Sequence, residues 1–367
     1  MTMRIVCAIE DPGAANGMVG LADALACHGA TLDIFATGAA RDYAPGIGLA
    51  VRSMDDLVLP FPPEDQPSAI IVGTSENPNS FVFSITAAAQ FAGIPSIGFV
   101  DGPANAEHRF RGMDSSPLAH VPDFLMVSDP AARDAFIALG VDAQNIDVVG
   151  HPAMDRVRAR AAALEMEGKA GVRARLFPDI DPARPLLLFL AETSGGLDPS
   201  QFRRAPDYTL SGRGKSDGRT EICLEETLDA VRNVQPDAAL VLRLHPKNDA
   251  KTFARYADEL SAISADGDPL EAVYASDLVV GMTSVLLFEA AVLGRPTLSV
   301  TPRESEATWL SSIALGLTRH VCTADGLAAS IREALNDGLQ GTTDIDEIVP
   351  PGAAARMADA VARRIAG

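Results

Sequence analysis

The chain has 367 residues, of which 47% are hydrophobic and 22% are charged, and its formal net charge at pH 7 is −19. This length suffices for two domains of ordinary size, each with its own core, and two domains predict a cleft. The negative charge repels polyanions, so nucleic acid and anionic membrane surfaces are not expected partners.

Cysteine usage and the N-terminal segment indicate the compartment. The four cysteines are scattered and lack metal-ligand spacing, which favours reduced thiols in a cytoplasmic protein. The first apolar run ends at Glu10, too early for a signal peptide. No apolar run approaches the ~20 residues that span a bilayer. We therefore expect a soluble, cytoplasmic protein with no transmembrane segment.

The first half of the chain alternates between the periods of strands and helices. Strands are predicted at 4–9, 31–36, 69–72, 96–100, 124–127 and 146–149, and helices at 17–28, 80–92 and 129–139. Such alternation predicts a parallel, doubly wound sheet with ligands at the carboxyl ends of its strands. The pattern then breaks at a helical stretch, 154–177, and a turn-rich hinge, 178–182.

A second series of the same kind follows the hinge. It comprises strand 186–190, helix 220–233, strand 239–244, helix 249–261, strand 278–280, helix 285–293, a strand that ends at 300, and helices 324–336 and 352–365. The expected fold class is α/β, with two Rossmann-like, doubly wound parallel-sheet domains. We place the N-terminal domain at 1–152, a helical connection at 153–179, the C-terminal domain at 180–348, and a helix that packs back on the N-terminal domain at 349–367.

The most informative segment is 275–300, which reads as a strand, a small polar turn, a helix and a second strand. Its turn, Gly281-Met282-Thr283-Ser284, lies at the carboxyl end of the strand and the start of the helix. Free backbone N–H groups and the positive end of the helix dipole favour an anion there, and phosphate is the usual occupant.

The order of these motifs resembles the GT-B architecture shared by nucleotide-sugar glycosyltransferases and the non-hydrolysing UDP-N-acetylglucosamine 2-epimerases. The matching pieces are DPGAAN at 11–16, AGIP at 92–95, VGHPAMD at 149–155, RLHPK at 243–247, and 275–296. The resemblance implies that the second domain binds the donor nucleotide and the first binds the acceptor. It is specific to the superfamily and not to one substrate; UDP is the expected nucleotide.

Residues of the second domain form the expected donor site. His245 follows a strand and precedes a proline, which fixes the imidazole at the strand end, and Arg243 and Lys247 flank it. Donors aimed at the leaving phosphate lower the barrier to glycosyl transfer. We expect His245 and its two basic neighbours to bind the diphosphate together with Thr283 and Ser284. The alternative for His245 is a histidine that only caps a turn.

Two further features belong to the same expected site. Glu289 lies in an apolar helix, and the resemblance implies that it binds the donor ribose; the alternative is a carboxylate on the helix surface. Ser194-Gly195-Gly196 follow the first strand of the domain, and their two glycines permit a turn that cradles phosphate. The basic stretch 198–219 after them is either a lid over phosphates or a solvated loop.

The catalytic base is expected in the first domain, because an inverting transferase must take the proton of the acceptor hydroxyl. Asp11 at the end of the first strand is the leading candidate, and Asp101 at the end of another strand is the second. His108, in the loop after Asp101, is the third. Local pairing or helix capping is the alternative for each of them. His151 is expected to line the cleft.

Three Asp-x-Asp matches, at 179–181, 266–268 and 344–346, lie in turn-like sequence, so we predict no required metal and no cofactor. The expected function is metal-independent glycosyl transfer from a nucleotide sugar to a glycan or glycoconjugate acceptor, in surface polysaccharide or glycoconjugate biosynthesis.

Three alternatives stay open. A UDP-N-acetylglucosamine 2-epimerase-like enzyme is one, although the opening lacks the Gly-Thr-Arg-Pro-Glu motif and the turn 281–284 replaces Asp-Ser-Gly-Gly. A sialyltransferase-like or glycerophosphotransferase-like enzyme that uses a cytidine nucleotide is the second. The third is a non-catalytic binding protein. The sequence does not indicate an oligomeric state.

Overall fold

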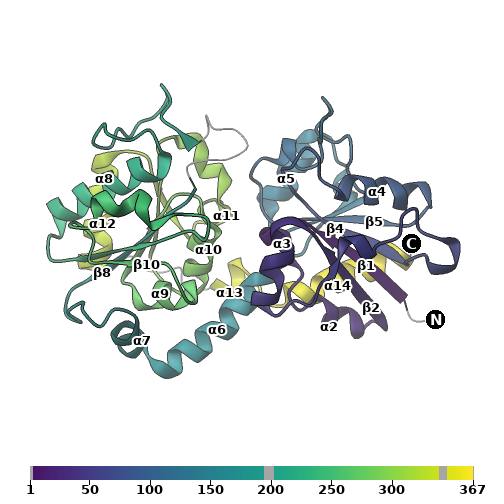
Figure 1. The fold of residues 1–367 in the computed structure, drawn as a ribbon, viewed down its shortest axis with the longest axis horizontal. Helices are drawn as coiled ribbons and strands as arrows, with labels where there is room; N and C mark the ends of the chain where they lie inside the picture. Colours follow the sequence, from purple (N-terminus) through teal and green to yellow (C-terminus); the bar gives the residue numbers. More distant parts are fainter. Residues whose placement is uncertain (1–2, 194–201, 339–344, 367) are drawn as a thin grey trace. The chain divides into compact units, whose positions relative to one another are not determined.

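The computed structural model describes residues 3–193, 202–338 and 345–366. Contacts divide the chain into two compact units, each of which is a parallel sheet with helices packed on its faces (Figure 1). Unit 1 comprises Met1–Arg156 and Val349–Gly367, and unit 2 comprises Val157–Ile348. This architecture confirms the predicted fold class.

The sheet of unit 1 has the order β3-β2-β1-β4-β5-β6-β7 in the described residues, and all its pairings are parallel. Its strands are β1 Met3–Ile9, β2 Ala30–Ala36, β3 Arg52–Ser53, β4 Ala69–Gly73, β5 Ser96–Val100, β6 Phe124–Val127 and β7 Ile146–Val148. Its helices are α1 Pro12–Gly17, α2 Leu21–Ala26, α3 Gly38–Tyr43, α4 Val82–Phe91, α5 Pro130–Leu139 and α14 Ala353–Ala366, with short 3₁₀ helices η1 Ala44–Ile47, η2 Met54–Asp56, η3 Pro63–Asp65, η4 Ala106–His108 and η5 Ala143–Asn145.

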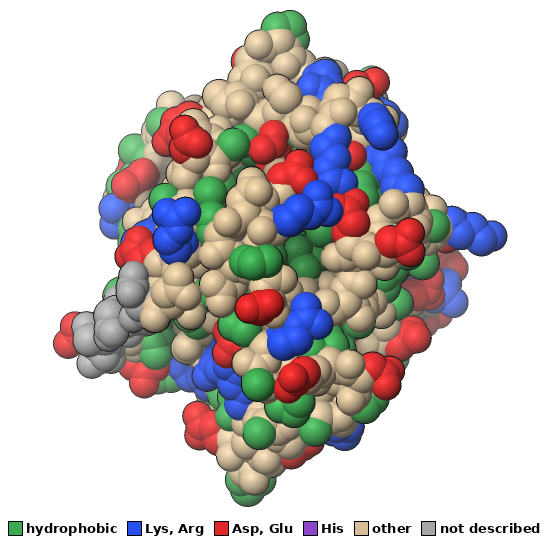
Figure 2. Space-filling model, turned by 90° about the vertical axis from the view of Figure 1, so that its left-hand side faces the viewer, with side chains coloured by type: hydrophobic (Ala, Val, Ile, Leu, Met, Phe, Trp, Pro, Cys, Tyr) green, Lys and Arg blue, Asp and Glu red, His purple; other side chains and the backbone are tan. Residues whose placement is uncertain are grey.

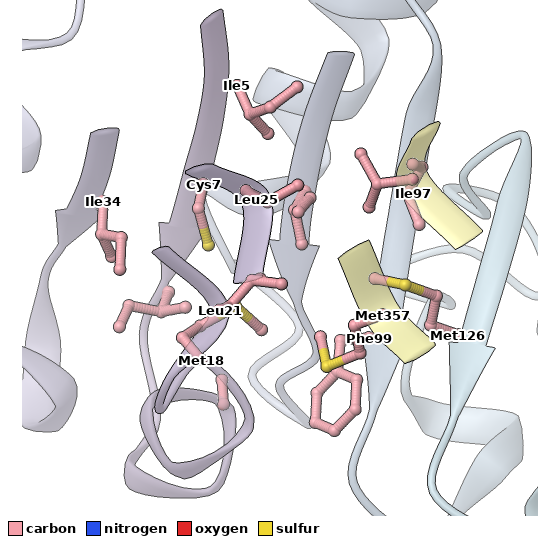
Figure 3. Close-up of a cluster of buried hydrophobic side chains, with 14 of the residues drawn as sticks. Ile5, Cys7, Met18, Leu21, Leu25, Ile34, Ile97, Phe99, Met126 and Met357 are labelled. Atoms are coloured by element: carbon pink, nitrogen blue, oxygen red, sulfur yellow. The ribbon is translucent and has the colours of Figure 1, made fainter. Parts of the chain in front are cut away.

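Strand β1 is apolar from Ile5 to Ile9, where both of its faces are buried, as in parallel sheets generally. Successive side chains point to opposite faces. Ile5 and Cys7 therefore join a core with Leu21 of α2 and Met357 of α14 (Figure 3). Val6, on the other face, joins the separate core formed with α4.

Helix α14 is held on unit 1 by polar contacts as well as by this core. Arg356 donates from Nε to the carbonyl oxygen of Val149 at 2.9 Å. Arg364 donates from Nη2 to the carbonyl oxygen of Gln144 at 2.7 Å, and its guanidinium lies over the ring of Phe124 at 4.4 Å. The last helix of the chain thus completes the first unit.

The sheet of unit 2 has the order β10-β9-β8-β11-β12-β13 in the described residues, again with parallel pairings. Its strands are β8 Leu186–Leu190, β9 Ala239–Arg243, β10 Ala262–Ser264, β11 Leu278–Gly281, β12 Thr297–Val300 and β13 Arg319–Val321. The helices are α6 Ala153–Glu167, which contains the boundary between the units, α7 Lys169–Leu176, α8 Arg219–Val234, η7 Ala250–Tyr256, α9 Pro269–Ala275, α10 Val285–Val292, η8 Glu304–Trp309, α11 Ser311–Ala314, α12 Ala324–Glu333, the π-helical turn η9 Ala334–Gly338, and α13 Ile345–Ile348.

Several predicted elements differ from the observed ones. The helix predicted at 17–28 is replaced by α1 and α2, which are separated by Gly20 at a φ of 74°. The helix predicted at 249–261 is the 3₁₀ helix η7. Strands β3, β10 and β13 were not predicted, because two or three residues are too few to show a period of two. Within the described ranges, no helix combines the length and apolar character needed to cross a membrane.

Candidate functional site

In unit 2, the point where the strand order reverses lies between β8 and β11. The chain proceeds from β8 to β9 on one side and from β11 to β12 on the other. In open parallel sheets, ligands bind outside the carboxyl ends of the strands at such a point. Glu192 follows β8 and Thr283 follows β11, so both residues lie at this edge.

The side chain of Glu192 lies at the turn 281–284, where the sequence predicts that an anion binds. The backbone N–H of Thr283 donates to Oε1 of Glu192 at 2.6 Å, and the Thr283 hydroxyl donates to Oε2 at 3.1 Å. The carbonyl oxygen of Glu192 accepts from the hydroxyl of Thr220 at 2.8 Å and from Nδ2 of Asn248 at 3.3 Å. A carboxylate of the chain itself therefore bonds to one of the predicted phosphate donors.

Arg219, at the first position of α8, connects this carboxylate to a second one. Its Nη1 donates to Oε2 of Glu192 at 2.8 Å, its Nε donates to Oε2 of Glu306 at 2.7 Å, and its Nη2 donates to the hydroxyl of Thr283 at 3.2 Å. Arg219 is 1% exposed and Glu306 is fully buried. Nη1 of Arg303 also approaches Oε1 of Glu306, at 3.1 Å. These residues form one buried, charged network.

Burial and ion pairing shift the pKa values of this network in opposite directions. Burial disfavours the charge on Arg219, but the carboxylates of Glu192 and Glu306 raise its pKa, so the guanidinium stays charged. Burial also raises the pKa of Glu306, while Arg219 and then Arg303 oppose that shift. Sequence reasoning missed Glu192 and Glu306 and assigned Arg219 only to a basic loop. No local pattern links residues that lie 27 and 87 positions apart.

His245 lies directly beyond the neighbouring strand, β9. Its Nδ1 accepts from the backbone N–H of Lys247 at 3.1 Å, and its own backbone N–H donates to Oδ1 of Asn248 at 2.9 Å. Burial, and then the charge of Lys247, lower the pKa of His245 against the opposing effect of Glu192. At neutral pH the imidazole is therefore uncharged and carries its proton on Nε2, from which it can donate. The side chain of Lys247 is exposed.

The guanidinium group of Arg243 is bonded to β10 and the loop after it. Its Nη1 donates to Oγ of Ser264 at 2.9 Å and to the carbonyl oxygen of Asp266 at 2.6 Å, and its Nη2 donates to the carbonyl oxygen of Gly267 at 2.8 Å. The side chain thereby attaches the end of β9 to the loop after β10. Only 8% of the residue is exposed.

The remaining residues of the expected donor site lie at or before α10. Ser284 is the N-cap of this helix, because its Oγ accepts from the backbone N–H of Leu286 at 3.2 Å. Glu289 lies inside the helix and is 6% exposed. Ser194, Gly195 and Gly196 lie outside the described residues.

The described part of the basic stretch pairs with acidic groups of the same unit. Nη2 of Arg213 contacts Asp229 at 2.7 Å, and its Nη1 contacts Glu259 at 2.6 Å. Arg204 contacts Asp217 at 3.4 Å. Within the described part of this stretch, the guanidinium groups of Arg204 and Arg213 therefore already have carboxylate partners.

In unit 1, the two carboxylates proposed as bases lie at the same edge of the sheet. Asp11 is the N-cap of α1, and its side chain makes no capping hydrogen bond. A Cβ atom added to Gly13 would lie 2.2 Å from Oδ2 of Asp101, so the Asp101 carboxylate packs against the first turn of α1. Nη2 of Arg109 lies 3.3 Å from Oδ1 of Asp101. The absence of a side chain at Gly13 permits this approach.

Further polar groups lie at this edge. Oε1 and Oε2 of Glu10 accept from Nδ2 of Asn77 at 2.7 Å and from Oγ of Ser80 at 2.6 Å. In the loop after β5, Asn105 donates from Nδ2 to Oε1 of Glu76 at 2.9 Å. Asn105 has a φ of 53°, a left-handed conformation that is uncommon outside glycine and concentrates at functional loops.

The two histidines of unit 1 differ in their surroundings. His108 lies on η4, partly exposed, with Nε2 at 3.6 Å from Oε1 of Glu107. His151 is 7% exposed, and its Nδ1 accepts from the backbone N–H of Ala153 at 3.2 Å. Burial lowers the pKa of His151 against the opposing charges of Asp101 and Asp129.

The described residues contain no group of three or more His, Cys, Asp or Glu side chains arranged to hold a metal ion. Two of the Asp-x-Asp matches supply turn and cap contacts. Asp181 accepts from the N–H of Ala183 at 2.9 Å, and Asp268 accepts from the N–H of Leu270 at 3.0 Å.

The sequence matches no family model and no curated protein, but solved structures share its fold. UDP-GlcNAc 2-epimerase from Neisseria meningitidis bound to UDP-GlcNAc has 12% identity and a TM-score of 0.68, with 99% of this chain and 100% of that one covered. UDP-GlcNAc 2-epimerase from Methanocaldococcus jannaschii has 12% identity and a TM-score of 0.67, with 98% and 100% covered. Anabaena Alr3699/HepE in complex with UDP-glucose has 13% identity and a TM-score of 0.54, with 99% and 95% covered. The chain therefore shares the two-domain, GT-B-like fold of these proteins.

Proposed function

We propose that the protein is an enzyme that acts on a nucleoside-diphosphate sugar and that unit 2 binds the nucleotide. The observation that carries this proposal is the gathering of donors at the carboxyl edge of β9 and β11. His245 offers Nε2–H, Lys247 offers its ammonium group, and Ser284 begins α10. Solved structures of the same fold contain UDP-GlcNAc or UDP-glucose, which supports a nucleotide sugar as the ligand class.

The reaction that we propose is metal-independent glycosyl transfer. Charge builds on the leaving phosphate as its bond to the sugar breaks, and Nε2–H of His245 with the ammonium group of Lys247 stabilises that charge. Those backbone N–H groups at the start of α10 that do not donate to Ser284 add to the same site. Glu289 binds the ribose. Unit 1 binds a glycan or glycoconjugate acceptor, with Asp11 or Asp101 as the base.

A second candidate reaction is epimerisation at C2 of UDP-N-acetylglucosamine. The solved epimerases that share the fold favour it. The two reactions differ in one requirement, because transfer needs an acceptor and epimerisation does not.

The first experiment is a binding screen of the purified protein against UDP, GDP, CDP, CMP and dTDP, with and without EDTA, by thermal shift. A ligand that binds only the native state raises the melting temperature by mass action. We expect UDP to raise the melting temperature both with and without EDTA. A protein that responds to none of the nucleotides contradicts the proposed function, and a response to CMP alone favours a cytidine-nucleotide enzyme.

The second experiment follows UDP-GlcNAc by proton NMR, with and without a glycan acceptor. UDP release that depends on the acceptor supports transfer, and a new UDP-sugar in the absence of acceptor supports epimerisation. His245→Ala should weaken UDP binding and lower turnover. Lys251→Gln, at an exposed lysine of the same unit, is the matched control. Unchanged UDP affinity and turnover in His245→Ala would remove His245 from the site.

A further inference from the structure

A wide, open cavity of about 450 Å³ lies in unit 2, at the edge of the sheet opposite to the proposed nucleotide site. Its lining includes residues 182–185, Asp277 and residues 294–296, which immediately precede β8, β11 and β12. These are the amino ends of the strands. The four residues of β11 lie between Asp277 and the turn at Thr283, and strands rise about 3.3 Å per residue. The cavity is therefore separate from the proposed nucleotide site.

The cavity is strongly cationic. Its lining has four basic residues and one carboxylate: Lys169, Arg173, Arg184, Arg295 and Asp277. The whole chain has a net charge of −19, and on the face shown in Figure 2 the basic side chains lie among acidic ones. An excess of positive charge around one cavity is thus a local feature that favours an anion.

Asp277 neutralises only part of this charge. Its carboxylate accepts from Nζ of Lys169, from Nη1 of Arg173 at 3.3 Å, and from the backbone N–H of Leu186 at 2.7 Å. Burial opposes ionisation of Asp277, but Lys169 and the other donors lower its pKa overall. The carboxylate is therefore ionised, and it is shared by two of the four basic side chains.

Two buried donors of the cavity lack a protein partner. Arg173 is 7% exposed, and its Nε is buried without a hydrogen bond, although Nη2 donates to the carbonyl oxygen of Arg184. Nε of Arg295 is also buried without a partner, and its guanidinium lies over the ring of Tyr274 at 5.0 Å. Buried polar groups are normally hydrogen-bonded, so both guanidinium groups retain donor capacity that the chain does not use.

We propose that this cavity binds a small polyanion that carries phosphate or carboxylate groups, at a site independent of the nucleotide. Guanidinium groups present paired donors that match the oxygens of both groups. Arg295 supplies the principal contact, because none of its N–H groups is committed to a hydrogen bond in the described structure.

The test uses isothermal titration calorimetry on the full-length protein, with pyrophosphate in one arm and citrate in the other. Each titration is performed with and without saturating UDP. With saturating UDP we expect one anion to bind per chain, and the anion that binds more tightly identifies phosphate or carboxylate as the preferred group. Without UDP, pyrophosphate can also occupy the proposed diphosphate site, so the titration with UDP decides the result. Arg295→Gln and Arg184→Gln should each weaken binding by about tenfold or more, since each removes a charged donor.

Two control variants make the result decisive. Arg332→Gln removes an exposed charge on α12 and should leave anion binding unchanged. Lys247→Gln alters the proposed nucleotide site and, in saturating UDP, should also leave it unchanged. The site is disproved if neither anion binds, if Arg295→Gln and Arg184→Gln bind as the unsubstituted protein does, or if Lys247→Gln alone abolishes binding. UDP binding is measured separately, so this failure differs from failure of the proposed function.

Discussion

The backbone N–H of Thr283 donates a hydrogen bond of 2.6 Å to Oε1 of Glu192. This bond joins the residues that follow β8 and β11, where the strand order of unit 2 reverses. A carboxylate of the chain thus contacts the turn at which a diphosphate is proposed to bind. A bound diphosphate must either displace Glu192 or use the N–H groups that follow Thr283.

The first prediction concerns this carboxylate. Glu192→Gln should raise the affinity for UDP by about tenfold, or about 1.4 kcal/mol, because it removes a negative charge next to the diphosphate. Calorimetric titration with UDP measures the change. Asp258→Asn, at an exposed position of the same unit, is the control. Weaker UDP binding in Glu192→Gln would instead identify Glu192 as a ligand contact.

The second prediction concerns the buried network around Arg219. Arg219→Met leaves the fully buried Glu306 with Arg303 as its remaining cation and should lower the free energy of unfolding of unit 2 by about 3–5 kcal/mol. Trp309 is the only tryptophan of the chain and lies with its ring 5.7 Å from the Arg219 guanidinium. Its fluorescence in urea titrations therefore reports this unit.

The control for this prediction is Arg319→Met. It removes a half-exposed ion pair with Glu333 and should cost only about 0–1 kcal/mol. Equal losses in the two variants would show that the buried network contributes no more than a surface pair.

The third prediction concerns the contact between Gly13 and Asp101. Gly13→Ala places a Cβ where Oδ2 of Asp101 would lie 2.2 Å away, so the carboxylate must shift. If Asp101 is the base, turnover should fall on the order of a hundredfold, as expected when a reacting group is misplaced by about 1 Å. The same substitution at Gly46, where a Cβ meets nothing within 4 Å, should leave turnover unchanged.

Asp101→Asn and Asp11→Asn complete this series. Loss of turnover in Asp11→Asn together with full turnover in Asp101→Asn and Gly13→Ala assigns the base to Asp11. Melting temperatures of all variants, followed by circular dichroism, separate lost activity from lost folding.

The fourth prediction concerns His151 and pH. Burial lowers the pKa of His151 below its ordinary value of 6.5, so the neutral form is favoured by folding. Its contribution to stability is therefore fully present above pH 6.5 and is lost as the pH falls through the lowered pKa. Urea unfolding of unit 1, followed by circular dichroism, should show lower stability at about pH 5.5 than at about pH 7.5.

His151→Asn should reduce this pH dependence, because an asparagine oxygen can still accept from the N–H of Ala153 but does not titrate. The lowered pKa values of His245 and His320 belong to unit 2. The Trp309 transition should therefore keep its pH dependence in the variant. If the stability of unit 1 changes with pH as steeply in the variant as in the unsubstituted protein, protonation of His151 is not coupled to folding.

Much of the fold could be predicted because its strands are short, apolar and buried on both faces. Residues 186–190 are all buried, and the sequence indicated a strand with the same bounds. Among the described edge strands, β3, β10 and β13 were missed for the converse reason, whereas β7 was predicted. Residues 52–53 are themselves polar, at least partly exposed, and too few to show a pattern.

The candidate site also has features that local sequence predicted and features that it did not. Local sequence was enough to place His245 after a strand, and Ser284 at the start of a helix, because a strand end and an N-cap are defined by neighbours in the chain. Local sequence did not indicate that Arg243 donates to the loop after β10, since that loop lies more than twenty residues away.

The sequence by itself determined the α/β alternation, the two series of strands and the polar turn after β11, since each depends on side-chain periods and turn residues within a few positions. Only the tertiary structure decided that Glu192 contacts this turn, that Arg219 joins it to Glu306, and that Asp101 lies against Gly13. The physical reason is that burial removes water from these charged groups. Each must then find a partner, and packing of distant segments determines which partner is within reach.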